Sequence, residues 1–210
     1  MTIGSESFFD RLIGVFDTGL RTLAREQPKD LEPPESDANL TPDEKKKSAA
    51  LMRVNHAGEV CAQGLYEGQA LVSRVESTRG DLLQAAEDEK RHLHWCEERL
   101  GQLEDSTSVL TPILYGLSVC VGAAAGLIGD RISLGFVEAT EDQVCKHLDG
   151  HLNEISSKDT QSREILEKIR EDEMRHGSNA LNKGGIEFPR PVKTGMTLVS
   201  KLMTETTRHI

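Results

Sequence analysis

Two copies of an E-x-x-H motif, Glu89 to His92 and Glu173 to His176, carry residue types that bind metal ions. On a helix, the spacing within the motif places the carboxylate and the imidazole on the same face. A single motif of this kind also fits an ordinary solvated helix face. Two copies indicate a metal site when each has a further ligand residue at a matching position in the sequence.

A lone glutamate precedes each motif at a nearly equal distance: Glu59 comes before Glu89, and Glu141 comes before Glu173. Each half of the chain therefore carries the same unit, a helix with one glutamate, a turn, and a helix with E-x-x-H. Ferritin-like bundles build a carboxylate-bridged dinuclear site from a duplicated hairpin of this type. The repeat predicts an all-α, ferritin-like four-helix bundle whose core binds two metal ions.

The donor set indicates which metals fit. Four carboxylates balance the charge of two divalent cations, and oxygen-rich ligation with one imidazole per metal favours iron or manganese over zinc. Without metal, the converging carboxylates would repel one another and take up protons. We expect Glu89 and Glu173 to bridge the metals. The predicted terminal ligands are Glu59 with His92 for one metal, and Glu141 with His176 for the other.

Glu138 competes with Glu141 for the ligand position, because it lies about one helical turn earlier on the same helix. We prefer Glu141, whose flanking residues match those of Glu59. His147 is open to two interpretations. It could hydrogen-bond to a ligand from outside the cluster, or it could be an ordinary surface or cap histidine.

Hydrophobic periodicity predicts helices almost throughout the chain. An amphipathic helix over residues 8–23 is followed by a proline-rich linker over 27–40. The segment Thr41-Pro-Asp-Glu44 is typical of a capping box that begins a long helix. We therefore divide the chain into an N-terminal helix and linker, 1–47, and a ferritin-like domain, 48–210. Further helices are expected over residues 42–75, 82–100, 130–155, 160–182 and 194–205, with a break at residues 79–81.

Residues 106–129 contain no charged side chain, and the part from 109 to 129 is long enough to cross a bilayer as a helix. A crossing would place the two predicted half-sites on opposite sides of the membrane, where they could not meet. We therefore expect this additional apolar segment to interact with the membrane by dipping into one leaflet, to pack on the bundle, or both. Its glycines would leave room for an apolar chain between helices, whereas an unusually apolar core helix is the alternative. The stripe of residues 8–23 could likewise pack on the bundle, a membrane or a partner.

The composition excludes several classes of protein. Among 210 residues, 25 are Lys or Arg and 35 are Asp or Glu, and this net charge of −10 argues against nucleic acid binding and a polybasic membrane anchor. Aromatic residues make up 4% and charged residues 29%, which favours helices over a β-sandwich. We find no C-x-x-C pair and no secretory signal, and we expect a reducing, cytoplasmic environment.

Several of these features together resemble one family, the demethoxyubiquinone hydroxylases of ubiquinone biosynthesis. The similar features are the string Arg53-Val-Asn-His-Ala-Gly-Glu59, the following Tyr66-Glu-Gly-Gln69, both E-x-x-H motifs and the glycine-rich apolar segment. The resemblance covers residues 48–210. It implies a monooxygenase in which two Fe ions per chain hydroxylate the ring of a demethoxyubiquinone-type polyprenyl quinol with O2, a late step of ubiquinone biosynthesis. The metal ligands it implies are Glu59, Glu89, His92, Glu141, Glu173 and His176.

A polyprenyl substrate is insoluble in water, so we expect a peripheral protein on the cytoplasmic side of a bacterial cell membrane. No dinucleotide-binding motif is visible, which leaves the electron donor open, with NADH as one candidate. A second copy of the chain and other ubiquinone-biosynthesis proteins are candidate partners. Two other functions also fit parts of the pattern: a ferritin-like iron-handling or peroxide-scavenging protein, and a non-catalytic helical scaffold that binds quinones or lipids.

Overall fold

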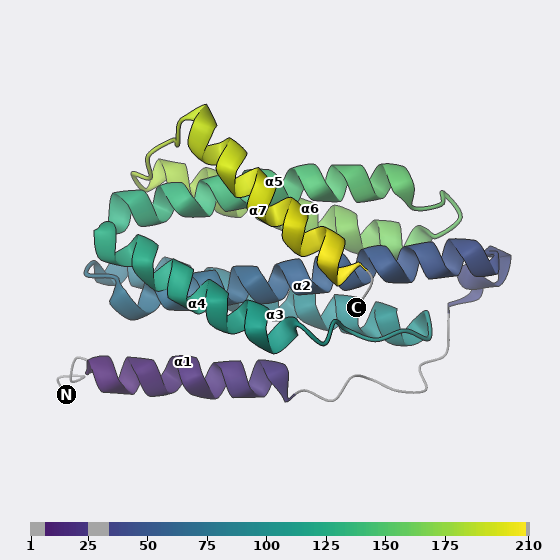
Figure 1. Ribbon diagram of the computed structural model, residues 1–210, viewed down its shortest axis with the longest axis horizontal. Helices are drawn as coiled ribbons and strands as arrows, with labels where there is room; N and C mark the ends of the chain where they lie inside the picture. The colour runs from purple at the N-terminus through teal and green to yellow at the C-terminus, as the bar shows by residue number, and fades with distance from the viewer. Residues whose placement is uncertain (1–6, 25–33, 209–210) are drawn as a thin grey trace.

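The chain folds into helices, as the periodicity predicts. The computed structural model describes residues 7–24 and 34–208, and within these residues it contains no strand (Figure 1). The α-helices are α1 (Phe8–Leu23), α2 (Pro42–Val72), α3 (Glu76–Gln102), α4 (Thr111–Ile128), α5 (Asp130–Glu154), α6 (Thr160–Asn182) and α7 (Arg190–Thr207). A short 3-10 helix spans Glu35–Asn39.

Four of these helices form the bundle that positions the predicted ligands. α2 pairs with α3, α5 pairs with α6, and the two hairpins meet through α2 with α5 and α3 with α6. α4 connects the hairpins and runs along α2 (Figure 1). This arrangement agrees with the predicted ferritin-like helical bundle. One apolar core cluster joins all four bundle helices, with Leu51, Leu100, Leu148, Leu166 and Ile169 among its members.

Local sequence signals account for most helix boundaries. The Thr41 hydroxyl accepts a hydrogen bond from the backbone N–H of Glu44, whose carboxylate accepts one from the backbone N–H of Thr41, so the predicted capping box begins α2. The predicted break at residues 79–81 is wrong, because α3 begins at Glu76 and continues through Gly80. One glycine within a helix costs about 1 kcal/mol, which burial of neighbours such as Leu82 offsets.

α7 also begins earlier than predicted, at Arg190, with Pro191 in its first turn. Proline is tolerated there because the first N–H groups of a helix have no intrahelical acceptor. α7 lies across α2 and α5 (Figure 1). The division of the chain at residue 47 stays a prediction.

Glycines bring α4 and α2 into close contact. A Cβ atom on Gly122 would overlap the carbonyl oxygen of Leu65, and one on Gly68 would overlap the carbonyl oxygen of Val119. These residues therefore let the two backbones touch. The expectation that Gly122 leaves room for an apolar chain is wrong, because its space is occupied by α2.

The opposite face of α4 is open to solvent. Among the described residues, α4 is the one helix that is long and apolar enough to cross a membrane, and 33% of this segment is buried. It lies along the bundle, and the two ligand-bearing hairpins remain together (Figure 1). The large exposed apolar side chains of α4 are Ile113, Leu117, Val121, Leu127 and Ile128.

α1 contacts the bundle through its small and polar side chains. The Tyr115 hydroxyl lies 3.2 Å from the carbonyl oxygen of Val15, and the Gln63 amide donates to the Thr22 hydroxyl at 3.0 Å. Gly19 lies directly against the Tyr115 ring. The apolar stripe consequently faces away from the bundle. Its exposed members are Phe8, Phe9, Leu12, Ile13, Phe16 and Leu20.

Candidate metal centre

The structure brings the six predicted ligands together in the middle of the bundle, and all six are buried. They are Glu59 from α2, Glu89 and His92 from α3, Glu141 from α5, and Glu173 and His176 from α6. Their donor atoms form two groups, each with its atoms within 4.8 Å of one another. The first group is Glu59, Glu89, His92 and Glu173, and the second is Glu141, Glu173 and His176.

Two glutamates stand between the two histidines. His92 Nδ1 lies 3.0 Å from a carboxylate oxygen of Glu89 and 3.0 Å from one of Glu173. His176 Nδ1 lies 3.1 Å from Glu173 and 3.6 Å from Glu89. Glu59 lies near His92, at 3.5 Å. Glu89 and Glu173 therefore occupy the positions from which carboxylates can bridge two ions.

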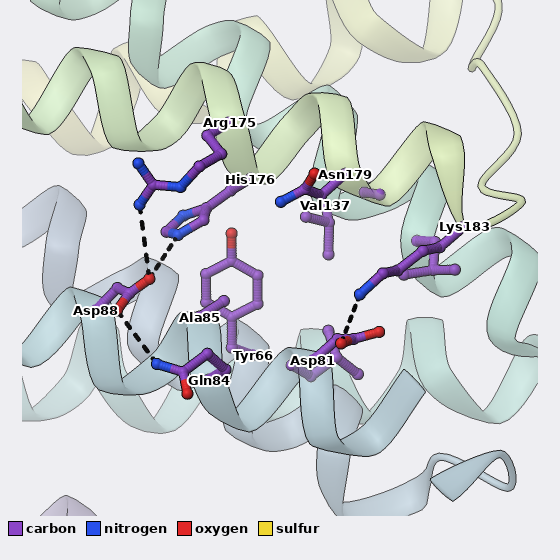
Figure 2. Close-up of a pocket in the computed structure, with 13 residues that line it drawn as sticks. Tyr66, Asp81, Gln84, Ala85, Asp88, Val137, Arg175, His176, Asn179 and Lys183 are labelled. Atoms are coloured by element: carbon purple, nitrogen blue, oxygen red, sulfur yellow. Dashed lines mark hydrogen bonds and ion pairs between the residues drawn. The ribbon is translucent and has the colours of Figure 1, made fainter. Parts of the chain in front are cut away.

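Each histidine turns its other ring nitrogen toward an aspartate on the facing helix. His92 Nε2 lies 3.0 Å from Asp172 on α6, and His176 Nε2 lies 3.1 Å from Asp88 on α3 (Figure 2 shows the second pair). An acceptor at Nε2 favours the tautomer that leaves the Nδ1 lone pair available to a metal. Neither aspartate was predicted, although the signal is visible: an aspartate precedes the glutamate of each motif, so the repeated unit is D-E-x-R-H.

The arginine of each repeat pairs with that aspartate. Arg91 lies 2.8 Å from Asp88, and Arg175 lies 2.6 Å from Asp172. Burial disfavours the charged carboxylates, but the facing histidine and this arginine outweigh it and lower the pKa of both aspartates. Both aspartates are therefore ionised at neutral pH and accept hydrogen bonds.

Tyr66 orients Glu141. Its hydroxyl donates a short hydrogen bond to the Glu141 carboxylate, and its ring packs edge-on against His176. Burial and the nearby carboxylates raise the pKa of Tyr66, which keeps the hydroxyl protonated. Gly177 leaves space for the same glutamate, since a Cβ atom there would lie 3.3 Å from the Cβ of Glu141. The sequence predicted neither role.

The two alternatives left open by the sequence lie outside the cluster. The Glu138 carboxylate accepts a hydrogen bond from Lys193 of α7 at 2.9 Å, whereas Glu141 lies beside Glu173 and His176. His147 Nε2 lies 2.9 Å from the Ser200 hydroxyl of α7. His147 is therefore engaged with α7 and not with a predicted ligand.

The electrostatics of the cluster fit two bound cations. Burial, together with the charges of Glu173 and Glu89, raises the pKa of Glu141 well above its usual range. Burial alone would lower the pKa of His176, but the carboxylates of Glu173 and Glu89 raise it to about 11. Buried oxygens of all three of these glutamates lack a hydrogen-bond donor. Cations would satisfy these oxygens and displace the protons, as at metal sites generally.

Several known proteins are similar in sequence to this chain over nearly its whole length. The family described as Ubiquinone biosynthesis protein COQ7 matches residues 46–207. A protein of Stutzerimonas stutzeri is 55% identical over 205 residues, covering 96% of this chain and 95% of the relative. Proteins of Pseudomonas aeruginosa (53% over 208 residues) and Azotobacter vinelandii (52% over 205 residues) cover the same shares. All three relatives are named 3-demethoxyubiquinol 3-hydroxylase.

Proposed function

The chain belongs to the ubiquinone biosynthesis protein COQ7 family, and from this premise we propose that it is a di-iron monooxygenase acting on a demethoxyubiquinone-type polyprenyl quinol. In the overall reaction, one atom of O2 enters a ring C–H bond and the other leaves as water. The balance requires two protons and two electrons from an external reductant, for which NADH is one candidate.

The observation that carries this proposal is the convergence of four buried glutamates and two buried histidines from both hairpins. Glu89 and Glu173 would bridge two iron ions. One terminal set would be Glu59 with His92, and the other Glu141 with His176. When bound, the two irons supply the redox chemistry toward O2, and oxygen-rich ligation of this kind suits iron.

Residues around the ligands would hold the site in its working geometry. Asp172 and Asp88 orient the two imidazoles, so that each presents Nδ1 to the centre. The Tyr66 hydroxyl keeps one Glu141 oxygen occupied and leaves the other free to bind. Burial of the six ligands shields the reacting atoms from most of the solvent.

We also propose that the protein binds the cytoplasmic face of a bacterial membrane from one side, where its apolar substrate dissolves. Two observations support this proposal. α4 exposes one apolar face although its other face packs on α2, and α1 turns its apolar stripe away from the bundle. Contiguous exposed apolar side chains of this kind are typical of surfaces that bind membranes or proteins.

The direct test compares wild type with Glu141→Gln and Glu138→Gln, two variants one turn apart on α5. We expect about two irons per wild-type chain, with the antiferromagnetic coupling of a bridged pair in the Mössbauer spectrum. Glu141→Gln should lose iron, and Glu138→Gln should retain it. With 18O2 and a demethoxyubiquinol in detergent, wild type should introduce one labelled oxygen atom into the ring.

Other outcomes would point to the other functions. Stoichiometric iron with peroxide consumption but no hydroxylated quinol would indicate an iron-handling or peroxide-scavenging protein. Quinone binding without iron, unchanged by Glu141→Gln, would indicate a non-catalytic scaffold.

A further inference from the structure

A pocket of about 210 Å³ reaches the His176 side of the cluster from the surface. Its walls come from α3, α5 and α6, and Tyr66 of α2 stands at its inner end between His176 and Val137 (Figure 2). A space of this size accommodates a few water molecules or a similarly small solute. It is too small for a ring that carries a polyprenyl tail.

The entrance of this α3–α6 pocket is polar, with balanced charge. Lys183 pairs with Asp81 at 2.6 Å, and Arg175 lies 3.9 Å from Asp88 (Figure 2). Asn179 stands at the rim of the same pocket. Because the two cations face two anions, the entrance presents hydrogen-bonding groups with no net charge that would attract or repel an ion. The wall further in includes apolar side chains, among them Leu82, Leu134 and Val137, so it is the entrance that favours small neutral polar molecules.

The two histidines differ in their access to this pocket. His176 lines it and is 8% exposed, whereas His92 is 0% exposed. Most of the large exposed apolar side chains belong to other helices, α1, α4 and α7, whereas α3 and α6 expose only Leu83, Met174 and Leu181. Water can therefore approach the cluster between α3 and α6, whereas a polyprenyl substrate would come from an apolar surface formed by other helices.

We propose that the α3–α6 pocket is an aqueous port through which small neutral polar molecules, water and hydrogen peroxide among them, reach and leave the metal centre. The inference rests on the proposed function, in which each turnover produces one water molecule inside a buried site. Through the port, that water would reach the solvent without crossing the apolar entrance that the substrate uses.

Two substitutions narrow the port from opposite walls, and a third is a matched control. Ala85→Phe fills it from α3, and Asn179→Trp covers its rim from α6. Ser178→Trp adds the same bulk to the neighbouring exposed residue of α6, which does not line the pocket. The probe is hydrogen peroxide mixed anaerobically with the diferrous protein. Peroxide takes one electron from each of two ferrous ions and, with two protons, becomes two waters.

Stopped-flow absorbance of the ferric product gives the rate, and iron content is measured on every sample. We expect Ala85→Phe and Asn179→Trp to slow the reaction at least tenfold while both irons remain bound, and Ser178→Trp to match wild type. Iron-loaded port variants that react within twofold of wild type would overturn the inference and leave the proposed function intact. Wild-type protein that binds no iron would overturn both. Because Asn179 is exposed, its variant remains a test even where Ala85→Phe disturbs folding.

Discussion

Asp172 lies 3.0 Å from His92 across the interface between α6 and α3, and Asp88 makes the matching contact with His176. Each E-x-x-H helix therefore orients the histidine of the other. The cluster is one interlocked unit, because no hairpin supplies both a histidine and the aspartate that positions it.

Removing the charge of one aspartate should weaken metal binding. We expect Asp172→Asn to lower Co2+ affinity by about 10- to 100-fold, because a weaker, uncharged amide replaces the carboxylate acceptor that orients His92. Trp95 offers a direct readout. It is the only tryptophan of the chain, and its ring centroid lies 5.4 Å from that of His92, so bound Co2+ should quench its fluorescence. Asp149→Asn, which removes an exposed partner of Arg170, serves as the control. Equal affinities in both variants would contradict the assigned role of Asp172.

A methyl group at Gly122 should force α2 and α4 apart. We expect Gly122→Ala to destabilise the metal-free protein by about 1–3 kcal/mol, since the new Cβ would overlap the backbone of Leu65. The matched change is Gly150→Ala on α5, where a Cβ would meet nothing within 4 Å. That variant should gain about 0.5–1 kcal/mol from reduced backbone entropy. Urea unfolding followed by circular dichroism gives the free energy of unfolding of each variant. A destabilised Gly150→Ala together with an unaffected Gly122→Ala would contradict our interpretation of the packing.

The exposed face of α4 should govern attachment to membranes. We expect Leu117→Glu to weaken binding to anionic phospholipid vesicles at least tenfold, because burying one leucine contributes about 1.5–3 kcal/mol. Leu181→Glu places the same charge on an exposed apolar position of α6 and should leave binding unchanged. Co-sedimentation with vesicles gives both values. Equal loss in the two variants would mean that net charge, and not the α4 face, controls attachment.

The cap of α2 should make stability depend on pH in a defined window. The Thr41 backbone N–H and the Ser156 and Thr41 hydroxyls lower the pKa of Glu44 from 4.5 to about 2. Because the folded protein holds the ionised form, this contribution is present above pH 4.5 and is lost as the pH falls toward about 2. Urea midpoints of wild type and Glu44→Gln should therefore differ near neutral pH and converge in acid.

Glu167→Gln is the control. It removes an exposed carboxylate on α6, so it measures how the loss of one negative charge by itself changes the urea midpoint. If the urea midpoints of wild type and Glu44→Gln differ by the same amount at neutral pH and near pH 2, the ionised cap is not the source of the difference.

Sequence patterns predicted the elements that are periodic and capped. The helix expected over residues 160–182 matches α6, whose first turn is capped by Asp159. The duplicated motif also predicted which six side chains converge. These features depend on local spacing, which a single sequence displays.

Contacts between distant helices were not predictable in the same way. The Asp172–His92 pair joins residues of two helices that are far apart in sequence, and only the repeated aspartate hints at it. Periodicity revealed the apolar stripe of α1 but not the medium that covers it. Gly122 likewise fits both an open channel and a close helix contact, and only the position of Leu65 decides between them.

The reciprocal aspartate–histidine contacts make each hairpin self-complementary. Two separate copies of such a hairpin, related by a twofold axis, could form the same pair of contacts as an isologous dimer. α4 joins the two halves covalently, so their meeting is intramolecular and no longer depends on protein concentration. The helix that exposes one apolar face thus also acts as the tether that sets the effective concentration of one half-site for the other.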